Sequence, residues 1–166
     1  MSRERWTHRF LWFSISAWGI AVGAKIYDLL VLGVAWGGAA PDSLAFYPYG
    51  KHWPINPGNF FQPLSVLILI AIVGALISGW KTVPSYRRWL WLSLGAFVLI
   101  WIATPTMFWP IINDLYQIAN HRPSAKLAET ATLIRHWFLY DSIRILVIAT
   151  GFVASVKAIS LPYRER

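Results

Sequence analysis

Residues 63–80 read PLSVLILIAIVGALISGW, an apolar run without a charged side chain. A helix that crosses the hydrocarbon core of a bilayer needs about 20 largely apolar residues. Three further apolar runs, at residues 10–36, 89–112 and 133–160, take up most of the remaining chain. Four spans leave little of the 166 residues for anything else, so we expect one membrane domain over residues 1–166, an all-α bundle of four helices.

The composition favours the same class. The chain is 57% hydrophobic and 13% charged, whereas about 25% of residues are charged in an average soluble protein. A net charge of +8 also occurs in proteins that bind nucleic acid. Here, however, the Lys and Arg residues collect at the ends of the apolar runs, as topology signals and contacts to anionic lipid do. We therefore exclude nucleic acid as a partner, and the absence of cysteine excludes disulfides and thiol chemistry.

The distribution of basic residues predicts that both termini lie in the cytoplasm. One side of the membrane would hold Arg3, Arg5, Arg9, Lys81, Arg87, Arg88, Lys157, Arg164 and Arg166. The other side would hold only Lys51, Arg122, Lys126 and Arg135. Positive charge is retained on the cytoplasmic side, so we expect a multi-pass protein of the bacterial inner membrane. The first run is too long and too charged for a cleaved signal peptide and should remain as a span.

The predicted connections differ in character. Residues 41–62, PDSLAFYPYGKHWPINPGNFFQ, form a long outer link that is rich in aromatic residues and proline and leaves little room for a helix or strand. Two interpretations stay open for this link: a lid folded over the mouth of the bundle, or simple packing at the interface. Pro105 and Pro110 should kink the third span or redirect its outer end. Residues 116–132 should form a polar loop with a short helix.

Charged residues inside the spans are the main functional signal. Lys25 and Asp28 lie in the first run, and Asp141 and Arg144 lie in the fourth. Each pair is spaced i, i+3, which places both members on one helix face. Counted at about 1.5 Å per residue from the outer ends of the spans, all four fall in one layer of the outer half of the membrane. Charge in hydrocarbon costs roughly 2.5–3.5 kcal/mol per residue, so such groups normally face the bundle interior and pair.

Several polar and aromatic residues are expected beside this layer. Asn113 and Asp114 should cap it from the third span, Trp137 shares a face with Asp141, and Tyr27 and Tyr140 adjoin it. Two interpretations remain open. The four charges are either interhelical ion pairs that clamp the first and fourth spans together, or a site for proton transfer and oxyanion binding.

Metal binding is a weaker alternative. His52, His121 and His136 fall on the predicted outer side, where three imidazoles near a carboxylate could hold zinc, iron or copper. Their spacing matches no metal motif, and two of them lie in predicted loops. We expect neither a metal nor another bound cofactor.

Three segments resemble a known family of small membrane proteins. AKIYDLLVLGVAW at residues 24–36 with PDSL at 41–44, FWPIINDL at 108–115, and WFLYDSIRILV at 137–147 with VKAIS at 156–160 are similar to segments of the anthrone oxygenase-like four-helix proteins, most of which have unknown function. Departures from the family pattern are Lys25 for a small residue, Asp28 for glutamate and Asp141 for asparagine. These changes put a shared substrate in doubt.

The resemblance implies oxidation of an anthrone to an anthraquinone by molecular oxygen without a dedicated cofactor. Asp28, or alternatively Asp141, would then remove a proton from the aromatic ketone. Arg144 with Asn113 would stabilise the enolate, and Lys25, Tyr27, Trp137 and Tyr140 would help to bind the ring. We therefore expect a protein that binds, and in the catalytic case oxidises, a small apolar aromatic or quinone-like molecule. The alternative is a non-catalytic accessory subunit of a larger membrane complex.

Overall fold

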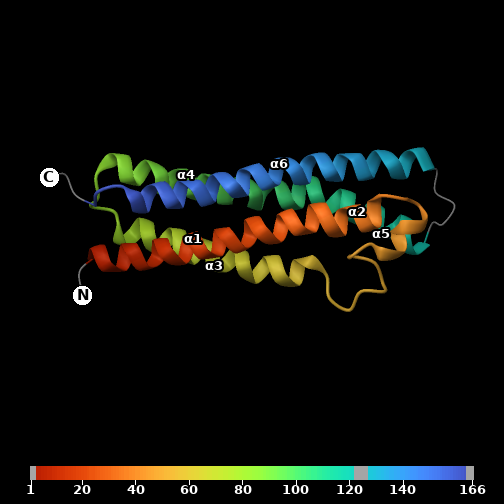
Figure 1. Ribbon diagram of the computed structural model, residues 1–166, viewed down its shortest axis with the longest axis horizontal. Helices are drawn as coiled ribbons and strands as arrows, with labels where there is room; N and C mark the ends of the chain where they lie inside the picture. The colour runs from red at the N-terminus through yellow and green to blue at the C-terminus, as the bar shows by residue number, and fades with distance from the viewer. Residues whose placement is uncertain (1–2, 122–126, 164–166) are drawn as a thin grey trace.

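The computed structural model describes residues 3–121 and 127–163, which form helices and no strand. Four helical segments are long and apolar enough to cross a membrane: Arg3–Gly37, Pro57–Ser78, Pro84–Asn120 and Leu127–Ser160. They lie side by side, with both chain termini at one end, here called the terminal end (Figure 1). The link between the first two segments lies at the opposite end, the loop end. The predicted all-α class and four apolar helices are confirmed, whereas Arg122, Lys126, Arg164 and Arg166, used in the charge count, lie outside the described residues.

Two of the four segments are built from consecutive helical elements. The first contains α1 (Arg3–Tyr27), the π-helical turn η1 (Asp28–Gly33) and α2 (Val34–Gly37). The second is α3 (Pro57–Ser78), and the third joins α4 (Pro84–Ala103), the π-helical turn η3 (Thr104–Phe108) and α5 (Trp109–His121). The fourth is α6 (Leu127–Ser160). All four segments begin earlier than predicted, at Arg3, Pro57, Pro84 and Leu127, because helical hydrogen bonding continues past the end of an apolar run.

The start of α3 shows why hydropathy alone misplaced this boundary. The Asn56 side chain accepts a hydrogen bond from the Gly58 N–H at 2.9 Å, and the Asn59 side chain accepts one from the Asn56 N–H at 3.1 Å. Pro57 follows the cap, where its missing N–H costs nothing. This reciprocal cap starts the helix six residues before the predicted apolar run.

The two prolines of the third span do not end its helix, although a π-helical turn forms at Pro105. The chain stays helical from Pro84 to His121, so residues 116–121 belong to α5 and not to a polar loop, while 122–126 lie outside the described residues. Pro105 sits in η3, where a wider turn accommodates a residue that has no N–H to donate. The hydroxyls of Thr104 and Thr106 donate to the carbonyls of Ile100 and Ile102, each at 2.8 Å, which satisfies backbone groups around the proline.

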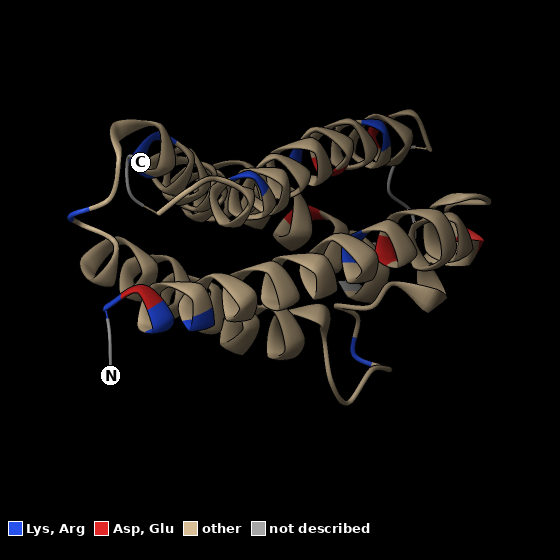
Figure 2. Cartoon of the chain, turned by 60° about the vertical axis from the view of Figure 1, so that its left-hand side comes forward, with Lys and Arg blue, Asp and Glu red and all other residues tan. Residues whose placement is uncertain are grey.

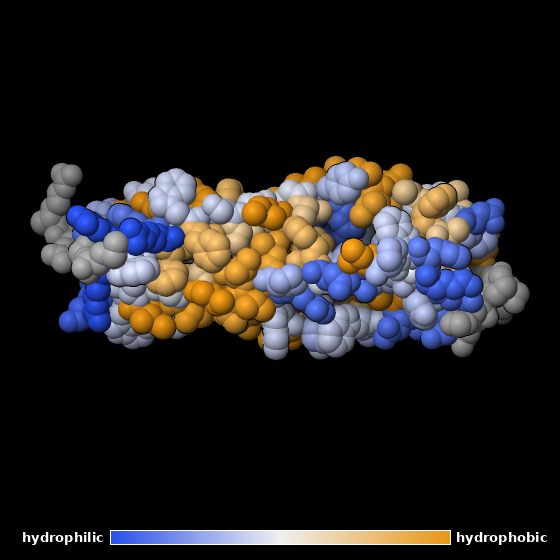
Figure 3. Space-filling model, turned by 90° about the horizontal axis from the view of Figure 1, so that it is seen from below, coloured by the Kyte–Doolittle hydropathy of each residue, from blue (hydrophilic) through white to orange (hydrophobic). Residues whose placement is uncertain are grey.

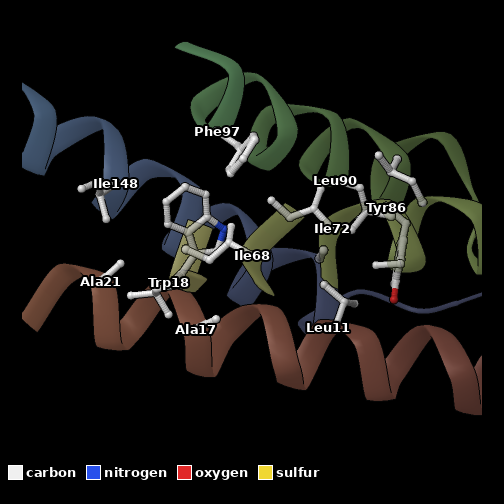
Figure 4. Packing of buried hydrophobic residues seen from close by; sticks show 14 of the residues in the cluster. Leu11, Ala17, Trp18, Ala21, Ile68, Ile72, Tyr86, Leu90, Phe97 and Ile148 are labelled. Carbon is white, nitrogen blue, oxygen red and sulfur yellow. The ribbon is translucent and has the colours of Figure 1, made fainter. Parts of the chain in front are cut away.

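The terminal half of the bundle holds an apolar core centred on Trp18. This side chain of α1 is 1% exposed and points between α4 and α6, with Ile68, Phe97 and Ile148 nearby (Figure 4). Trp18 approaches α6 closely because position 151 is glycine, where a Cβ atom would lie 2.6 Å from the indole ring. Its Nε1–H donates to the Ser93 hydroxyl at 3.1 Å.

Serine hydroxyls extend that contact across three helices. Ser155 lies 3.0 Å from Ser14 and 3.1 Å from Ser93, and all three are buried. Ser93 also donates to the Gly151 carbonyl at 3.2 Å. This network ties α1, α4 and α6 together with every hydroxyl partnered, so we assign it a structural role.

The loop end has a second core, which includes part of the link between α2 and α3. Trp36 lies against Tyr47 and Trp137, with ring centroids 5.0 and 4.9 Å apart. Leu44 and Tyr47 of the link are buried with these rings. The link contains the 3₁₀ helix η2 (Asp42–Phe46), contrary to the expectation that it has little room for a helix. Residues 38–56, here named the lid segment, thus pack against the loop end of the bundle.

Candidate functional site

The charged residues of the first and fourth segments meet in the loop-end half of the bundle. Lys25 Nζ forms ion pairs with Asp28 Oδ2 and with Asp141 Oδ1, the latter at 2.9 Å. Arg144 Nη2 binds the same oxygen of Asp141. Lys25 is 3% exposed and Asp141 0%. The four residues, here called the charge cluster, contain two cations and two anions at one depth.

The local helix geometry explains this convergence. Each i, i+3 pair projects from one face of its helix, and α1 packs against α6. Asp28 is the first residue of η1, where the chain changes from α- to π-helical turns. Such turns occur mostly as single insertions and are frequent at functional sites. Away from the cluster the spans carry few charges, and most charged residues gather toward the two ends of the bundle (Figure 2).

Aromatic rings form the walls of the charge cluster. Lys25 Nζ lies over the rings of Phe61 and Trp137, 5.2 and 5.7 Å from their centroids. The Arg144 guanidinium carbon lies 3.8 Å from the centroid of Phe108. Cation–π attraction strengthens where water is excluded, so these rings hold both cations in place. Trp137 was expected here from its i, i+4 spacing to Asp141, whereas Phe61 and Phe108 share no helical spacing with the charges and were not expected.

Three buried polar atoms of this region have no hydrogen-bond partner among the described residues: Asp141 Oδ2, Arg144 Nε and Trp36 Nε1. An unsatisfied buried group costs about 1–3 kcal/mol. Asp141 and Arg144 already share one hydrogen bond, so their free acceptor and free donor belong to one contacting pair. A hydroxyl group both donates and accepts a hydrogen bond through one oxygen. It could therefore donate to Asp141 Oδ2 and accept from Arg144 Nε.

Other predicted site residues lie elsewhere. Tyr27 is 57% exposed, because a residue two positions after Lys25 projects from the opposite side of the helix. Asn113 and Asp114 are exposed while their neighbours Ile111 and Leu115 are buried. In the described part of the chain, no hydrogen bond or ion pair joins these three exposed residues to the charge cluster.

Tyr140 lies nearer to the site than these residues do. It is half-buried, with its ring 6.4 Å from Phe108 and stacked on His136 at 5.9 Å. Tyr140 is therefore connected to the charge cluster through Phe108, whose ring also faces Arg144.

The histidines do not gather around a carboxylate within the described part of the chain. His52 and His136 are exposed, and the side chain of His121 lies outside the described residues. The described residues contain no group of three His, Cys, Asp or Glu side chains that could hold a metal ion.

Two tyrosines of the lid segment interact electrostatically with the charge cluster, and neither was expected from the sequence. The Tyr47 hydroxyl donates to the Ile112 carbonyl at 3.3 Å, and the Tyr47 and Tyr49 ring centroids are 5.6 Å apart. Burial raises the pKa of Tyr47 well above its usual value. Burial also raises the pKa of Tyr49 to about 12, with Asp28 and Asp141 adding to the effect and Arg144 opposing it. Tyr49 therefore lies within electrostatic reach of three members of the cluster.

Two hollows are evident among the described residues. One, of about 280 Å³, lies beside the lid segment and is lined partly by Asp42, Lys51, His52 and Asn120. The other, of about 330 Å³, lies at the terminal end and is lined by Arg3, Trp6, Phe10, Gly74, Ile77 and Ser78. Neither hollow is lined by a residue of the charge cluster.

No protein-family model, curated protein or solved structure matches this chain.

Proposed function

We propose that this chain is a multi-pass integral membrane protein that binds a small apolar aromatic or quinone-like molecule at the charge cluster. The observation that carries the proposal is the unpaired acceptor and donor on Asp141 and Arg144 between aromatic walls. A phenol or an enolised ketone supplies a hydroxyl that donates to Asp141 and accepts from Arg144. Its ring takes the place against Trp137 and Phe108 that an apolar ligand favours.

In this proposal the terminal end faces the cytoplasm, as the basic residues predict, and the lid segment faces the opposite side of the inner membrane. The ligand enters from the outer leaflet or the outer aqueous phase when residues 38–56 open. Lid closure then excludes water, which strengthens the electrostatic interactions in the site.

The catalytic form of the proposal is a cofactor-independent oxygenase of the anthrone type. Asp28 takes a proton from the methylene carbon that lies across the central ring from the ketone, and the electron pair moves through the ring system to the ketone oxygen to form an enolate. Lys25 keeps its second partner, Asp141, when Asp28 becomes neutral. The negative charge lost at Asp28 reappears on the enolate beside Arg144, so the total charge of the buried site is unchanged. Molecular oxygen then oxidises the electron-rich carbon, and the balanced outcome is anthrone plus O₂ to anthraquinone plus water.

Two charge-compensated double variants separate binding from chemistry. Asp141→Asn with Arg144→Met removes the proposed ligand contacts, and Lys25→Met with Asp28→Asn removes the base while keeping the Asp141–Arg144 pair. The purified protein is titrated with anthrone, with tryptophan fluorescence reporting binding and an oxygen electrode reporting turnover.

We expect the first double variant to lose binding and the second to bind without oxygen uptake. Asp114→Asn, at an exposed carboxylate, is the matched control and should behave as wild type. Unchanged anthrone binding in the first variant contradicts the binding proposal. Unchanged oxygen uptake in the second contradicts only the role of Asp28.

A second function, a non-catalytic subunit, is favoured by large aromatic side chains on the outside of α4. Trp101 is 66% exposed, and Trp91 is also exposed. A tryptophan far from either end of the bundle is unusual on a surface that meets only lipid tails, since tryptophan concentrates at membrane interfaces. Recovery of the protein with a stoichiometric partner in mild detergent, lost in Trp101→Leu, supports this alternative.

A further inference from the structure

The hollow at the terminal end combines an apolar lining with cationic surroundings. Phe10 and Gly74 form its floor, where the phenyl ring lies so close to α3 that a Cβ atom at position 74 would be 2.6 Å from it. Trp6 and Ile77 form its walls, and both are exposed, Ile77 by 68%. The hollow is therefore open to the outside of the bundle between α1 and α3.

Arginines border this hollow. Arg3 is one of its lining residues, and the guanidinium carbon of Arg9 lies 5.4 Å from the ring centroid of Trp6. The described residues at the same end also include Arg5, Lys81, Arg87, Arg88 and Lys157, against the single acidic residue Glu4. Figure 3 shows a hydrophobic belt on the face of the bundle seen there, with a strongly hydrophilic zone at the end nearest the termini. The hollow thus lies where apolar surface gives way to positive charge.

We propose that this hollow binds one anionic phospholipid, with an acyl chain against Trp6, Phe10 and Ile77 and the phosphate beside Arg3. The volume of about 330 Å³ is at the lower end of the range for ligand sites, enough for part of one acyl chain. The apolar lining excludes a purely polar ligand such as free phosphate from the hollow itself. The excess of cations selects an acidic headgroup over a zwitterionic one. This site is separate from the charge cluster, so it does not depend on the proposed function.

The test is native mass spectrometry of the purified full chain, titrated with phosphatidylglycerol or with phosphatidylcholine of identical acyl chains. We expect tighter binding of phosphatidylglycerol. Arg3→Gln should weaken phosphatidylglycerol binding about fivefold and leave phosphatidylcholine nearly unchanged, the effect expected for one basic residue near the headgroup. Ser78→Leu, which adds a larger side chain to the lining, should weaken both lipids. Arg135→Gln, at an exposed arginine of the loop end, is the matched control and should change neither.

Four results would overturn the proposal. The first is equal affinity of wild type for the two lipids. The second is an equal effect of Arg3→Gln and Arg135→Gln, which indicates that net charge alone matters. The third is a second copy of the chain at the hollow, seen as a dimer that Ser78→Leu dissociates. Glycerol phosphate, offered without acyl chains, should fail to displace the bound lipid, and displacement at equal concentration likewise counts against it.

Discussion

Removing single charges from the cluster should destabilise the protein far more than removing a balanced pair. Lys25 contacts both Asp28 and Asp141, and the four charges sum to zero. Lys25→Met leaves two carboxylates facing one guanidinium, and Asp28→Asn leaves two cations facing Asp141. Breaking a buried ion pair from one side costs about 3–5 kcal/mol, because the remaining charge stays buried without compensation. The combined variant Lys25→Met, Asp28→Asn retains the Asp141–Arg144 pair and zero net charge.

We therefore expect each single variant to lose about 3–5 kcal/mol of unfolding free energy and the double variant to lose less than either single one. The assay is equilibrium unfolding in mixed micelles, with increasing denaturing detergent and helix content followed by circular dichroism. Asp114→Asn is the control, expected within about 0.5 kcal/mol of wild type because its carboxylate is exposed. If the double variant loses the sum of the two single effects, Lys25 and Asp28 do not share one electrostatic site. The four charges would then not act as one cluster.

The same unfolding assay checks three further predictions. Gly151→Ala should cost about 1–3 kcal/mol of unfolding free energy, since the new Cβ would lie 2.6 Å from the Trp18 ring. Gly95→Ala is the control and should be neutral or stabilising, because nothing lies within 4 Å of its new Cβ. Equal stability of the two variants would contradict the packing of Trp18 against α6. Ser93→Ala should cost about 1–2 kcal/mol by leaving the Trp18 N–H without its acceptor, and a neutral effect would mean that the network contributes nothing. Tyr49 ionises near pH 10 when unfolded but has a pKa of about 12 when folded, so burial favours its neutral form. The contribution of Tyr49 to the free energy of unfolding should be full below pH 10 and be lost between pH 10 and about 12. Tyr49→Phe should reduce that loss, and identical pH profiles of wild type and variant would refute the assignment.

The number of helices and the pairing of charges within each helix could be predicted from the sequence. Apolar runs of about 20 residues predict spans because hydrocarbon cannot satisfy unpaired backbone groups. The i, i+3 spacing of Lys25 with Asp28, and of Asp141 with Arg144, predicts a common face because the period of the α-helix is fixed. Both inferences depend only on local geometry.

Which apolar side chains face the core could not be predicted, because lipid tails are as apolar as a protein interior. Trp18 is 1% exposed and Trp101 66%, although both lie within apolar runs. The difference was decided by neighbouring helices: Gly151 and Ser93 receive Trp18, whereas no corresponding contact is described for Trp101.

The membership of the candidate site was likewise decided by tertiary structure. The helix continues through Pro105, with Phe108 at the end of η3 beside the Arg144 guanidinium and Asn113 exposed on α5. Tyr49 reaches the cluster only because the lid segment folds back onto the bundle end. The sequence by itself determined where charge is buried along each helix. Only the packed structure determined which rings and hydroxyls surround that charge. A π-helical turn changes the direction in which later side chains project, and the link folds back onto the bundle, and neither follows from a constant helical period.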